Sequence, residues 1–271
     1  MVCPKVGFSM CLILFAYRSH PDYPLVLAAN RDEYYRRPTQ PLDFWQDKAD
    51  ILAGRDLEGM GTWLGINRNG RWSALTNFRG AAVPLAAPPS RGDLVRDYIA
   101  GMAPPADYLE HVRDVGSRYG GFNLVVGDST DVFYYTNQAH DIHHFQPGIH
   151  GISTCLLGVE WPKITRGKAG MSHRISGGQE ITTEPFFQLL QDATIPPEDD
   201  IPRTGMDRDW ERTLSPLFIE SDTYGTRSSS VILIEKTGKV TFAERTHVKN
   251  GVKSPAHGTR EFTYQIGAVP S

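Results

Sequence analysis

Short apolar runs separated by polar turns dominate the sequence of this chain. Residues 12–17 and 25–29 are continuous apolar runs of strand length, joined by a segment rich in turn-forming residues, and they predict two adjacent buried strands. Residues 61–66 and 71–76 flank the sequence Asn-Arg-Asn-Gly at 67–70, and Asn-Gly between two such runs is typical of a β-hairpin. Further strands are predicted at residues 51–54, 122–126, 132–136, 142–145, 148–153, 227–235, 240–246 and 261–266.

Apolar residues at helical spacing predict a smaller number of helices. Ser90 and Asp93 match a capping-box pattern just ahead of an amphipathic segment, which predicts a helix start. Residues 104–117 predict a second helix with a proline in its first turn. Two more helices are predicted at residues 163–175 and 184–192, and proline-containing segments predict loops at residues 34–50, 80–89 and 193–208.

The order of these elements predicts an α+β fold. Strands come first, helices follow and strands return, joined by hairpins rather than by alternating βαβ units, which favours antiparallel sheets. No clear linker divides the chain, so residues 10–271 are predicted to form a single domain. Residues 1–9 differ in character from the rest of the chain. We interpret them as an N-terminal extension, and whether the mature protein carries it stays open.

Composition excludes several classes of function. The net charge of −3 gives no basic surface for nucleic acid, so no nucleic-acid partner is expected. No apolar run reaches the roughly 20 residues that a membrane-spanning helix requires, so no membrane span is expected. The three cysteines are odd in number and far apart, which suggests no disulfide framework and favours a reducing compartment. With no targeting signal recognised, the cytoplasm is the expected location.

Motif searches for nucleotide and metal sites are negative. The chain has neither a Gly-x-x-x-x-Gly-Lys-Ser/Thr loop nor a Gly-x-Gly-x-x-Gly sequence after a strand, so no nucleotide site is expected. The histidines at His140, His143 and His144 match no zinc signature. We interpret this cluster as a solvated strand edge rather than a metal or haem site, and no metal is predicted.

The residues that could carry chemistry gather at predicted strand ends. Cys11 leads the first strand, and residues 30–33 follow the second, so adjacent strands would bring them to one sheet edge. If Cys11 is the N-terminal residue, its α-amine, with a pKa of about 7.7–8.0, can accept the thiol proton. Acyl transfer also needs oxyanion donors and charged groups that orient the nucleophile. The residues offering these groups are Asn30, Arg31, Asp32, Asn77 and Arg227.

Two alternatives to this chemistry stay open at the level of sequence. Cysteine at a strand start is often a small buried apolar residue with no reactive role. The free amine also depends on the start of the mature protein: initiation at Met10 would expose Cys11, whereas initiation at Met1 would leave it inside the chain. Self-processing between Met10 and Cys11 is a third possibility.

Seven motifs occur in an order seen in a known family. They are Met10-Cys11 and the segments at residues 29–33 (Ala-Asn-Arg-Asp-Glu), 61–65 (Gly-Thr-Trp-Leu-Gly), 74–78 (Ala-Leu-Thr-Asn-Phe), 91–92 (Arg-Gly), 121–124 (Gly-Phe-Asn-Leu) and 224–227 (Tyr-Gly-Thr-Arg). With them, the chain resembles the NRDE family, the transport and Golgi organization 2-like group, from Met10 to about Ile266. The resemblance implies an N-terminal-nucleophile hydrolase fold, a four-layer αββα sandwich of two antiparallel sheets flanked by helices.

The layout is more remotely similar to cysteine amidases of the bile-salt hydrolase and penicillin V acylase group. This likeness implies catalytic roles for an N-terminal cysteine, an arginine, an aspartate, an oxyanion asparagine and a late arginine. The matching positions are Cys11, Arg31, Asp32, Asn77 and Arg227. The family's second asparagine falls at Thr154, whose hydroxyl can donate one hydrogen bond but cannot reproduce an amide.

Six residues are candidates for binding a substrate, and several also have a structural interpretation. Trp63 would serve as a core residue or pocket wall, Asn123 would satisfy main-chain groups, and Arg91 would cap a helix or face an anion. Arg31 could simply pair with Asp32 or Glu33. The six candidates are Asn30, Glu33, Trp63, Arg91, Asn123 and Thr154.

Two functions are therefore carried forward. The first is a cysteine N-terminal-nucleophile amidohydrolase acting on an amide or thioester of a small, partly apolar molecule, with no cofactor required. The second is a non-catalytic binding protein that holds haem or an acyl-CoA-like lipid in the same pocket. Both imply a small-molecule partner, and the sequence indicates no oligomeric state.

Overall fold

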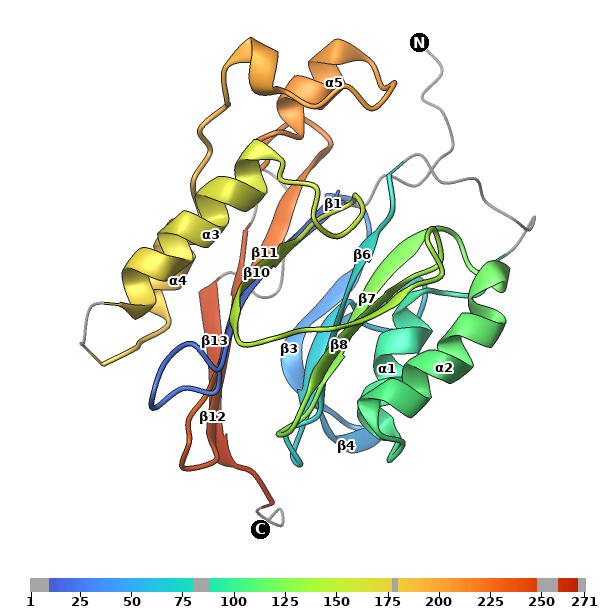
Figure 1. Ribbon diagram of the computed structural model, residues 1–271, viewed down its shortest axis with the longest axis vertical. Coiled ribbons are helices and arrows are strands. Elements are labelled where there is room, and N and C mark those ends of the chain that lie inside the picture. Colours follow the sequence, from blue (N-terminus) through green and yellow to red (C-terminus); the bar gives the residue numbers. More distant parts are fainter. Residues whose placement is uncertain (1–9, 80–87, 177–179, 248–257, 268–271) are drawn as a thin grey trace.

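The computed structural model describes residues 10–79, 88–176, 180–247 and 258–267, which form two antiparallel sheets stacked between helices (Figure 1). The first sheet, sheet A, has six strands in the order β10 (Gly148–Ile152), β1 (Met10–Tyr17), β2 (Leu25–Tyr34), β11 (Tyr224–Ile234), β12 (Lys239–Thr246) and β13 (Gly258–Gln265). Sheet B has seven strands in sequence order: β3 (Thr39–Trp45), β4 (Lys48–Asp56), β5 (Leu64–Asn67), β6 (Trp72–Asn77), β7 (Phe122–Gly127), β8 (Val132–Thr136) and β9 (Ile142–His144).

Helices cover the outer face of each sheet, as Figure 1 shows. Helices α1 (Gly92–Ala100) and α2 (Pro105–Val115) lie on sheet B, and α3 (Pro162–Ile175) and α4 (Glu184–Leu190) lie on sheet A. The remaining helical segments are α5 (Arg208–Thr213) and the 3-10 turns η1 (Gly116–Arg118) and η2 (Glu198–Asp200). The expected α+β fold and its four-layer αββα arrangement are confirmed.

The apolar run of the first strand is continuous because both faces of sheet A are covered. Ile13 and Phe15 point into the core between the two sheets, while Leu12 and Leu14 point into a second core beneath α3 and α4. All four side chains are fully buried. A strand buried on both faces reads as an unbroken apolar run rather than as an alternation.

The predicted hairpin at residues 61–76 is confirmed, with β5 and β6 pairing from Leu64 opposite Ala74 to Ile66 opposite Trp72. The Oδ1 atom of Asn67 accepts the main-chain N–H groups of Asn69 and Arg71 at 2.9 and 3.0 Å. Gly70 has φ of +81°, a conformation that glycine adopts without steric cost. The Asn-Gly sequence therefore predicted this turn correctly.

The prediction of a loop over residues 34–50 is wrong, because β3 and β4 occupy most of it. Proline is tolerated in β3 since this is an edge strand, where one main-chain donor is not needed for pairing. The ladder is irregular between Gln40 and Asp43. There the Leu42 N–H donates instead to the Glu244 carboxylate of sheet A at 2.8 Å.

The capping-box prediction at Ser90–Asp93 is also wrong. Helix α1 begins at Gly92 with Arg91 as its N-cap residue, and no side chain caps it. The Asp93 carboxylate instead pairs with Arg96 at 2.6 Å, one helical turn later. Helix α5, whose six residues follow the predicted loop, was not expected from the sequence.

The histidine cluster lies where the sequence analysis placed it, at a solvated strand edge. His143 and His144 are exposed on β9, the last strand of sheet B, and His144 Nε2 lies 2.8 Å from the Asp131 carboxylate. His140 precedes the strand with φ of +55°. It therefore does not share a strand face with the others.

Candidate functional site

Strands β1 and β2 bring Cys11 beside the polar segment that follows the second apolar run. Their antiparallel register pairs Cys11 with Arg31 and Met10 with Asp32. The predicted juxtaposition of these residues is thus confirmed. Strand β2 nevertheless continues to Tyr34, so the polar residues lie within a strand rather than beyond its end.

This extension divides the four polar residues between two faces of sheet A. Side chains alternate along a strand, and Leu27 and Ala29 face the core between the sheets, so Arg31 and Glu33 continue that face. Asn30 lies on the opposite face, where its amide donates to the carbonyls of Leu190 and Leu217 at 2.9 and 2.8 Å. The structure therefore places Asn30 in a structural network under the helices, away from the face of Arg31.

Cys11 is 2% exposed and lies in a charged environment between the sheets. Burial lowers the pKa of Arg91, while the nearby Glu33 and the Cys11 thiol act in the opposite direction. Arg91 also donates to the Gly121 carbonyl at 3.1 Å. The arginine thus neither caps α1 through its side chain nor lies far from the thiol.

Arg31 is buried without the partners that such a charge usually has. It is 5% exposed, and its Nη1 atom is buried with no hydrogen-bond partner. A buried cation is costly unless it is paired and fully hydrogen-bonded. The simple ion pair of Arg31 with Asp32 or Glu33 is not formed among the described residues.

Asp32 and Lys163, which α3 supplies from a distant part of the chain, are both buried and interact electrostatically. Thr226 Oγ1 donates to Asp32 Oδ1 at 2.7 Å. Burial raises the pKa of Asp32 to about 7 against the opposing charge of Lys163, and burial lowers the pKa of Lys163 to about 8. Lys163 Nζ donates to the Leu214 carbonyl at 3.0 Å, which holds this cation near Asp32.

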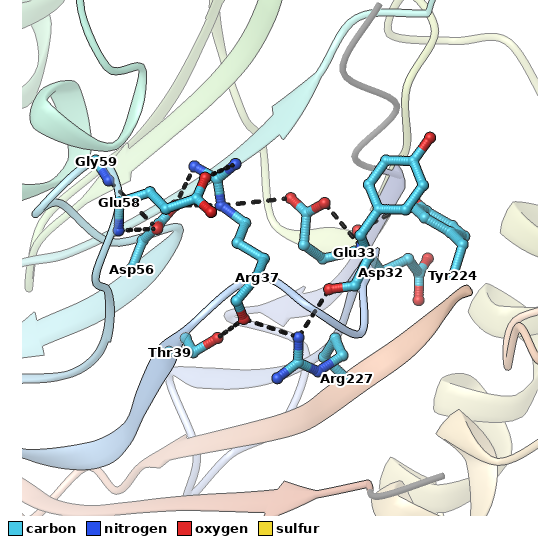
Figure 2. A network of polar contacts seen from close by, with 10 residues as sticks. Asp32, Glu33, Arg37, Thr39, Asp56, Glu58, Gly59, Tyr224 and Arg227 are labelled. Carbon is cyan, nitrogen blue, oxygen red and sulfur yellow. Dashed lines mark hydrogen bonds and ion pairs between the residues drawn. The ribbon is translucent and has the colours of Figure 1, made fainter. Parts of the chain in front are cut away.

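Arg227 occupies a bulge in β11, where the pairing with β2 shifts between Thr226 and Ser228. A bulge re-aims the side chain of the extra residue. Arg227 Nη1 donates to the carbonyls of Tyr34 and Arg37 at 2.8 and 3.0 Å, as Figure 2 shows. Burial and the charge of Arg31 both lower the pKa of Arg227, and the two arginines line the same recess.

Arg37 completes the network on the acidic side of Arg227. Its guanidinium pairs with Asp56 at 2.7 Å, with Glu58 at 3.0 Å and, at 3.8 Å, with Glu33 (Figure 2). Glu33 also accepts the Tyr34 N–H at 2.8 Å. These carboxylates are therefore satisfied by Arg37, which leaves Arg31 and Arg227 with no carboxylate of their own in this network.

A recess with an enclosed space of about 30 Å³ begins at Arg31 and lies between the two sheets. Trp63 forms part of its wall and packs partly against the inter-sheet core, so the structure supports both interpretations of this residue. The lining residues are Arg31, Thr39, Gln40, Pro41, Gly54, Arg55, Asp56, Trp63, Arg227, Ser228, Glu244 and Thr246.

Asn123 holds the ends of several strands together. Its amide donates to the carbonyls of Ser153 and Cys155 at 2.8 and 3.0 Å and to the Thr76 hydroxyl at 3.1 Å. Its Oδ1 accepts from the Tyr134 hydroxyl at 2.7 Å. Every hydrogen-bonding group of this side chain is used, which supports the structural interpretation of Asn123.

The same bridge places Asn77 and Thr154 near the head of β1. Ser153 Oγ donates to the Cys11 carbonyl at 3.2 Å, and Thr76 donates to the Ser153 carbonyl at 2.8 Å. Thr154 follows and is buried. Asn77 ends β6 with 9% exposure, and its amide side chain forms no hydrogen bond within the described residues.

Sequence reasoning missed Lys163 and Glu244. Glu244 lies on β12, accepts the Leu42 N–H and has its pKa raised by burial. Both residues lie in segments that read as an ordinary helix and an ordinary strand. The only signal in the sequence was a charged residue at a position that faces inward. Which face of α3 or β12 points inward could not be recognised without the packing of the layers.

The comparisons with known proteins identify the family. The family model described as "Transport and Golgi organisation 2" matches residues 10–249. The chain belongs to the Transport and Golgi organisation 2 family. The mouse "Transport and Golgi organization 2 homolog" is 32% identical over 278 residues, which cover 94% of this chain and 100% of that protein. The fruit-fly "Transport and Golgi organization protein 2" is 29% identical over 263 residues, 88% and 92% of the two chains. The family predicted from the seven motifs is confirmed.

Two solved structures resemble this family member at low sequence identity. An N-acylethanolamine-hydrolyzing acid amidase ortholog from Caenorhabditis elegans has a TM-score of 0.49 and 9% identity, with 82% of this chain and 92% of that chain covered. A mutant of conjugated bile acid hydrolase from Clostridium perfringens has a TM-score of 0.47 and 10% identity, with 97% and 99% covered.

The described residues contain neither a helix suited to span a membrane nor a cluster of metal ligands. None of the helices there is both long and apolar enough to cross a membrane. No group of three or more His, Cys, Asp or Glu side chains in the same part of the chain could hold a metal ion. The predicted extension at residues 1–9 lies outside the described residues, and the single-domain assignment stays a prediction.

Proposed function

We propose that this protein is a cysteine N-terminal-nucleophile amidohydrolase that cleaves an amide or thioester of a small, partly apolar molecule. The observation that carries the proposal is the register of β1 and β2, which places Met10 opposite Asp32 and Cys11 opposite Arg31. Removal of residues 1–10 would leave a new amine on Cys11 at the position facing Asp32. The amine would then stand at the head of β1, with the Cys11 thiol and the Arg31 guanidinium on one face of sheet A and the Asp32 carboxylate on the other.

The amine is the base in this mechanism. The Cys11 thiol attacks the acyl carbon, a sulfur–carbon bond forms, and the thiol proton moves to the α-amine. Asp32 orients the amine, and the positive charge on a protonated amine would lower the raised pKa of that carboxyl. Arg31, the cross-strand neighbour of Cys11, stabilises the thiolate as it forms.

The second half of the reaction releases both products. The tetrahedral oxyanion accepts hydrogen bonds from the Asn77 amide and a main-chain N–H. The carbon–nitrogen or carbon–sulfur bond then breaks, and the leaving group takes the proton from the amine. Water hydrolyses the acyl-enzyme with the same amine as base, which regenerates the thiol. Thr154 offers one hydroxyl near this point, so Asn77 supplies the amide donor.

The test begins with the intact mass of the protein expressed without an N-terminal tag. The expected mass starts at Cys11. The same sample is then incubated with a panel of activated acyl thioesters, and one acyl adduct on Cys11 is expected by mass spectrometry. The adduct should vanish in Cys11→Ala and persist in Cys155→Ser, a matched control because burial raises the pKa of the Cys155 thiol to about 11.

The opposite results would remove this mechanism. A mature protein that retains residues before Cys11 lacks the base, and an adduct that persists in Cys11→Ala would lie on another nucleophile. In that case the binding function becomes the proposal, with haem or an acyl-CoA-like lipid as ligand. A haemin titration followed by visible absorption tests the haem version, since a saturable spectral change is required.

A further inference from the structure

The recess beside Arg31 has an unusual balance of charge. Four ionised groups besides Arg31 line it, and two of these are already neutralised. Asp56 is paired with Arg37 at 2.7 Å. Arg55 donates to both carboxylate oxygens of Asp47 at 2.7 and 3.0 Å and lies over the Trp45 ring. Because each is already paired with an opposite charge, Asp56 and Arg55 should interact only weakly with a charged ligand.

The remaining acidic group, Glu244, is a weak competitor for the arginines. Its carboxylate already accepts the Leu42 N–H at 2.8 Å, and burial raises its pKa, which favours the neutral form. One carboxyl group cannot balance two guanidinium groups. The recess therefore has an excess of positive charge.

That excess lies on Arg31 and Arg227. The hydrogen bonds of Arg227 Nη1 go to two main-chain carbonyls, which are neutral. Arg31 is 5% exposed, lines the recess and has an Nη1 atom with no hydrogen-bond partner. Two nearby cations, one of them buried, repel each other unless an anion joins them, and guanidinium groups bind carboxylate and phosphate oxygens through paired N–H donors.

The other residues that line the recess indicate what kind of molecule could carry such an anionic group. Trp63 and Pro41 provide apolar surface, and Gln40, Ser228 and Thr246 provide neutral polar groups. The enclosed space of the recess is only about 30 Å³, which limits the part of a ligand that enters it to a small group. An anionic headgroup whose partly apolar remainder extends out of the recess fits these surroundings.

We propose that this recess is an anion subsite in which Arg31 and Arg227 bind a carboxylate or phosphate group of a small ligand. This assignment rests on the proposed function: Cys11 reacts with the amide or thioester, so the anionic group bound by Arg31 and Arg227 belongs to another part of the same substrate. That part lies close to the reacting bond because Arg31 is the cross-strand neighbour of Cys11. The substrate class is then an amide or thioester whose molecule carries a separate anionic group.

The experiment measures binding without catalysis. Isothermal titration calorimetry on the full chain with Cys11→Ala compares hexanoate, inorganic phosphate and the neutral hexanamide. Hexanoate or phosphate is expected to bind at one saturable site, at least about tenfold more tightly than hexanamide, because charge-assisted hydrogen bonds to a buried arginine are involved. Saturation by only one of the two anions identifies which anionic group the site accepts.

Matched arginine variants locate the site. Arg227→Gln in the same background is expected to weaken anion binding by about tenfold or more. Arg55→Gln, which removes a cation already paired with Asp47, should change it by less than about twofold. If Arg227→Gln does not fold, the comparison of hexanoate with hexanamide on the Cys11→Ala protein still tests whether the site requires a negative charge.

The proposal is overturned if neither anion saturates, if hexanamide binds as well as hexanoate, or if Arg55→Gln weakens binding as much as Arg227→Gln. None of these results depends on acylation of Cys11. A missing acyl adduct would contradict the proposed hydrolase while leaving the anion subsite intact, so the two failures are distinguishable.

Discussion

Arg79 and Arg31 are both almost fully buried, yet their surroundings differ. The Arg79 side chain is 4% exposed and pairs at 2.6 Å with Glu211, which is 1% exposed, and it lies over the Trp161 ring. Glu211 also accepts from the main-chain N–H and the hydroxyl of Thr204. Arg31 has a buried Nη1 atom with no such partner. Arg79 Nε is likewise buried without a hydrogen-bond partner. What separates the two arginines is therefore the carboxylate that pairs with Arg79 and that Arg31 lacks among the described residues.

A second pair of residues shows the same contrast. Asn123 uses its whole amide group to bind strand ends, whereas the Asn77 amide forms no hydrogen bond within the described residues. Both asparagines end or begin strands of sheet B that pair with each other. The fold thus uses the Asn123 amide to hold strand ends and leaves the Asn77 amide without such a structural contact among the described residues.

The largest effect is expected on breaking the satisfied ion pair. Arg79→Met should lower the free energy of unfolding by about 3–5 kcal/mol, because it leaves the Glu211 charge buried and uncompensated. Urea denaturation measures this change. The double variant Arg79→Met with Glu211→Leu should recover much of the loss, and a double variant as unstable as the single one would contradict the role of the pair.

The two asparagines should respond differently to truncation. Asn123→Leu should cost about 1–3 kcal/mol in urea denaturation, because buried carbonyls lose their donors. Asn77→Ala should cost less than about 1 kcal/mol but abolish the acyl adduct on Cys11. Equal stability losses in the two variants would show that Asn77 is structural as well.

Substitution of Arg31 should affect stability and acylation of Cys11 differently. Arg31→Met removes a poorly satisfied buried charge, so the free energy of unfolding should stay within about 1 kcal/mol of the parent or increase. Acylation of Cys11 should fall in the same variant. A loss of stability as large as that of Arg79→Met would remove the distinction between the two arginines.

The smallest expected effect is a change in the titration of Asp32. Its folded pKa of about 7 exceeds the ordinary value of 3.8, so the contribution of this group to stability is full at low pH and falls as the pH rises towards 7. Lys163→Met removes the nearby cation and should raise the Asp32 pKa further. Carbon-13 NMR of the carboxyl groups, with Asp32→Asn for assignment, measures this shift.

A control for that shift lies on the same helix. Lys168 is paired with Glu160 at the surface, at 2.8 Å, so Lys168→Met should leave the Asp32 titration unchanged. An equal shift in both variants would mean that helix α3, rather than the charge of Lys163, sets the pKa of Asp32.

The sequence by itself determined most of the strands, the main hairpin and the pairing of β1 with β2, whereas β3 was not expected from it. Residues 12–17 are too short and too uniformly apolar for anything but a strand buried on both faces, and the Asn-Gly turn fixed the hairpin of β5 and β6. The seven ordered motifs also determined the family. Each of these signals is local, so it needs no knowledge of the rest of the chain.

Only the tertiary structure decided which face each polar side chain occupies. Strand side chains alternate, so the continuation of β2 to Tyr34 separates Asn30 from Arg31, and a single bulge re-aims Arg227. Strand length and bulges depend on long-range pairing that local sequence does not encode. Lys163 and Glu244 lie far from the first two strands along the chain, and only packing of the layers brings them to the site.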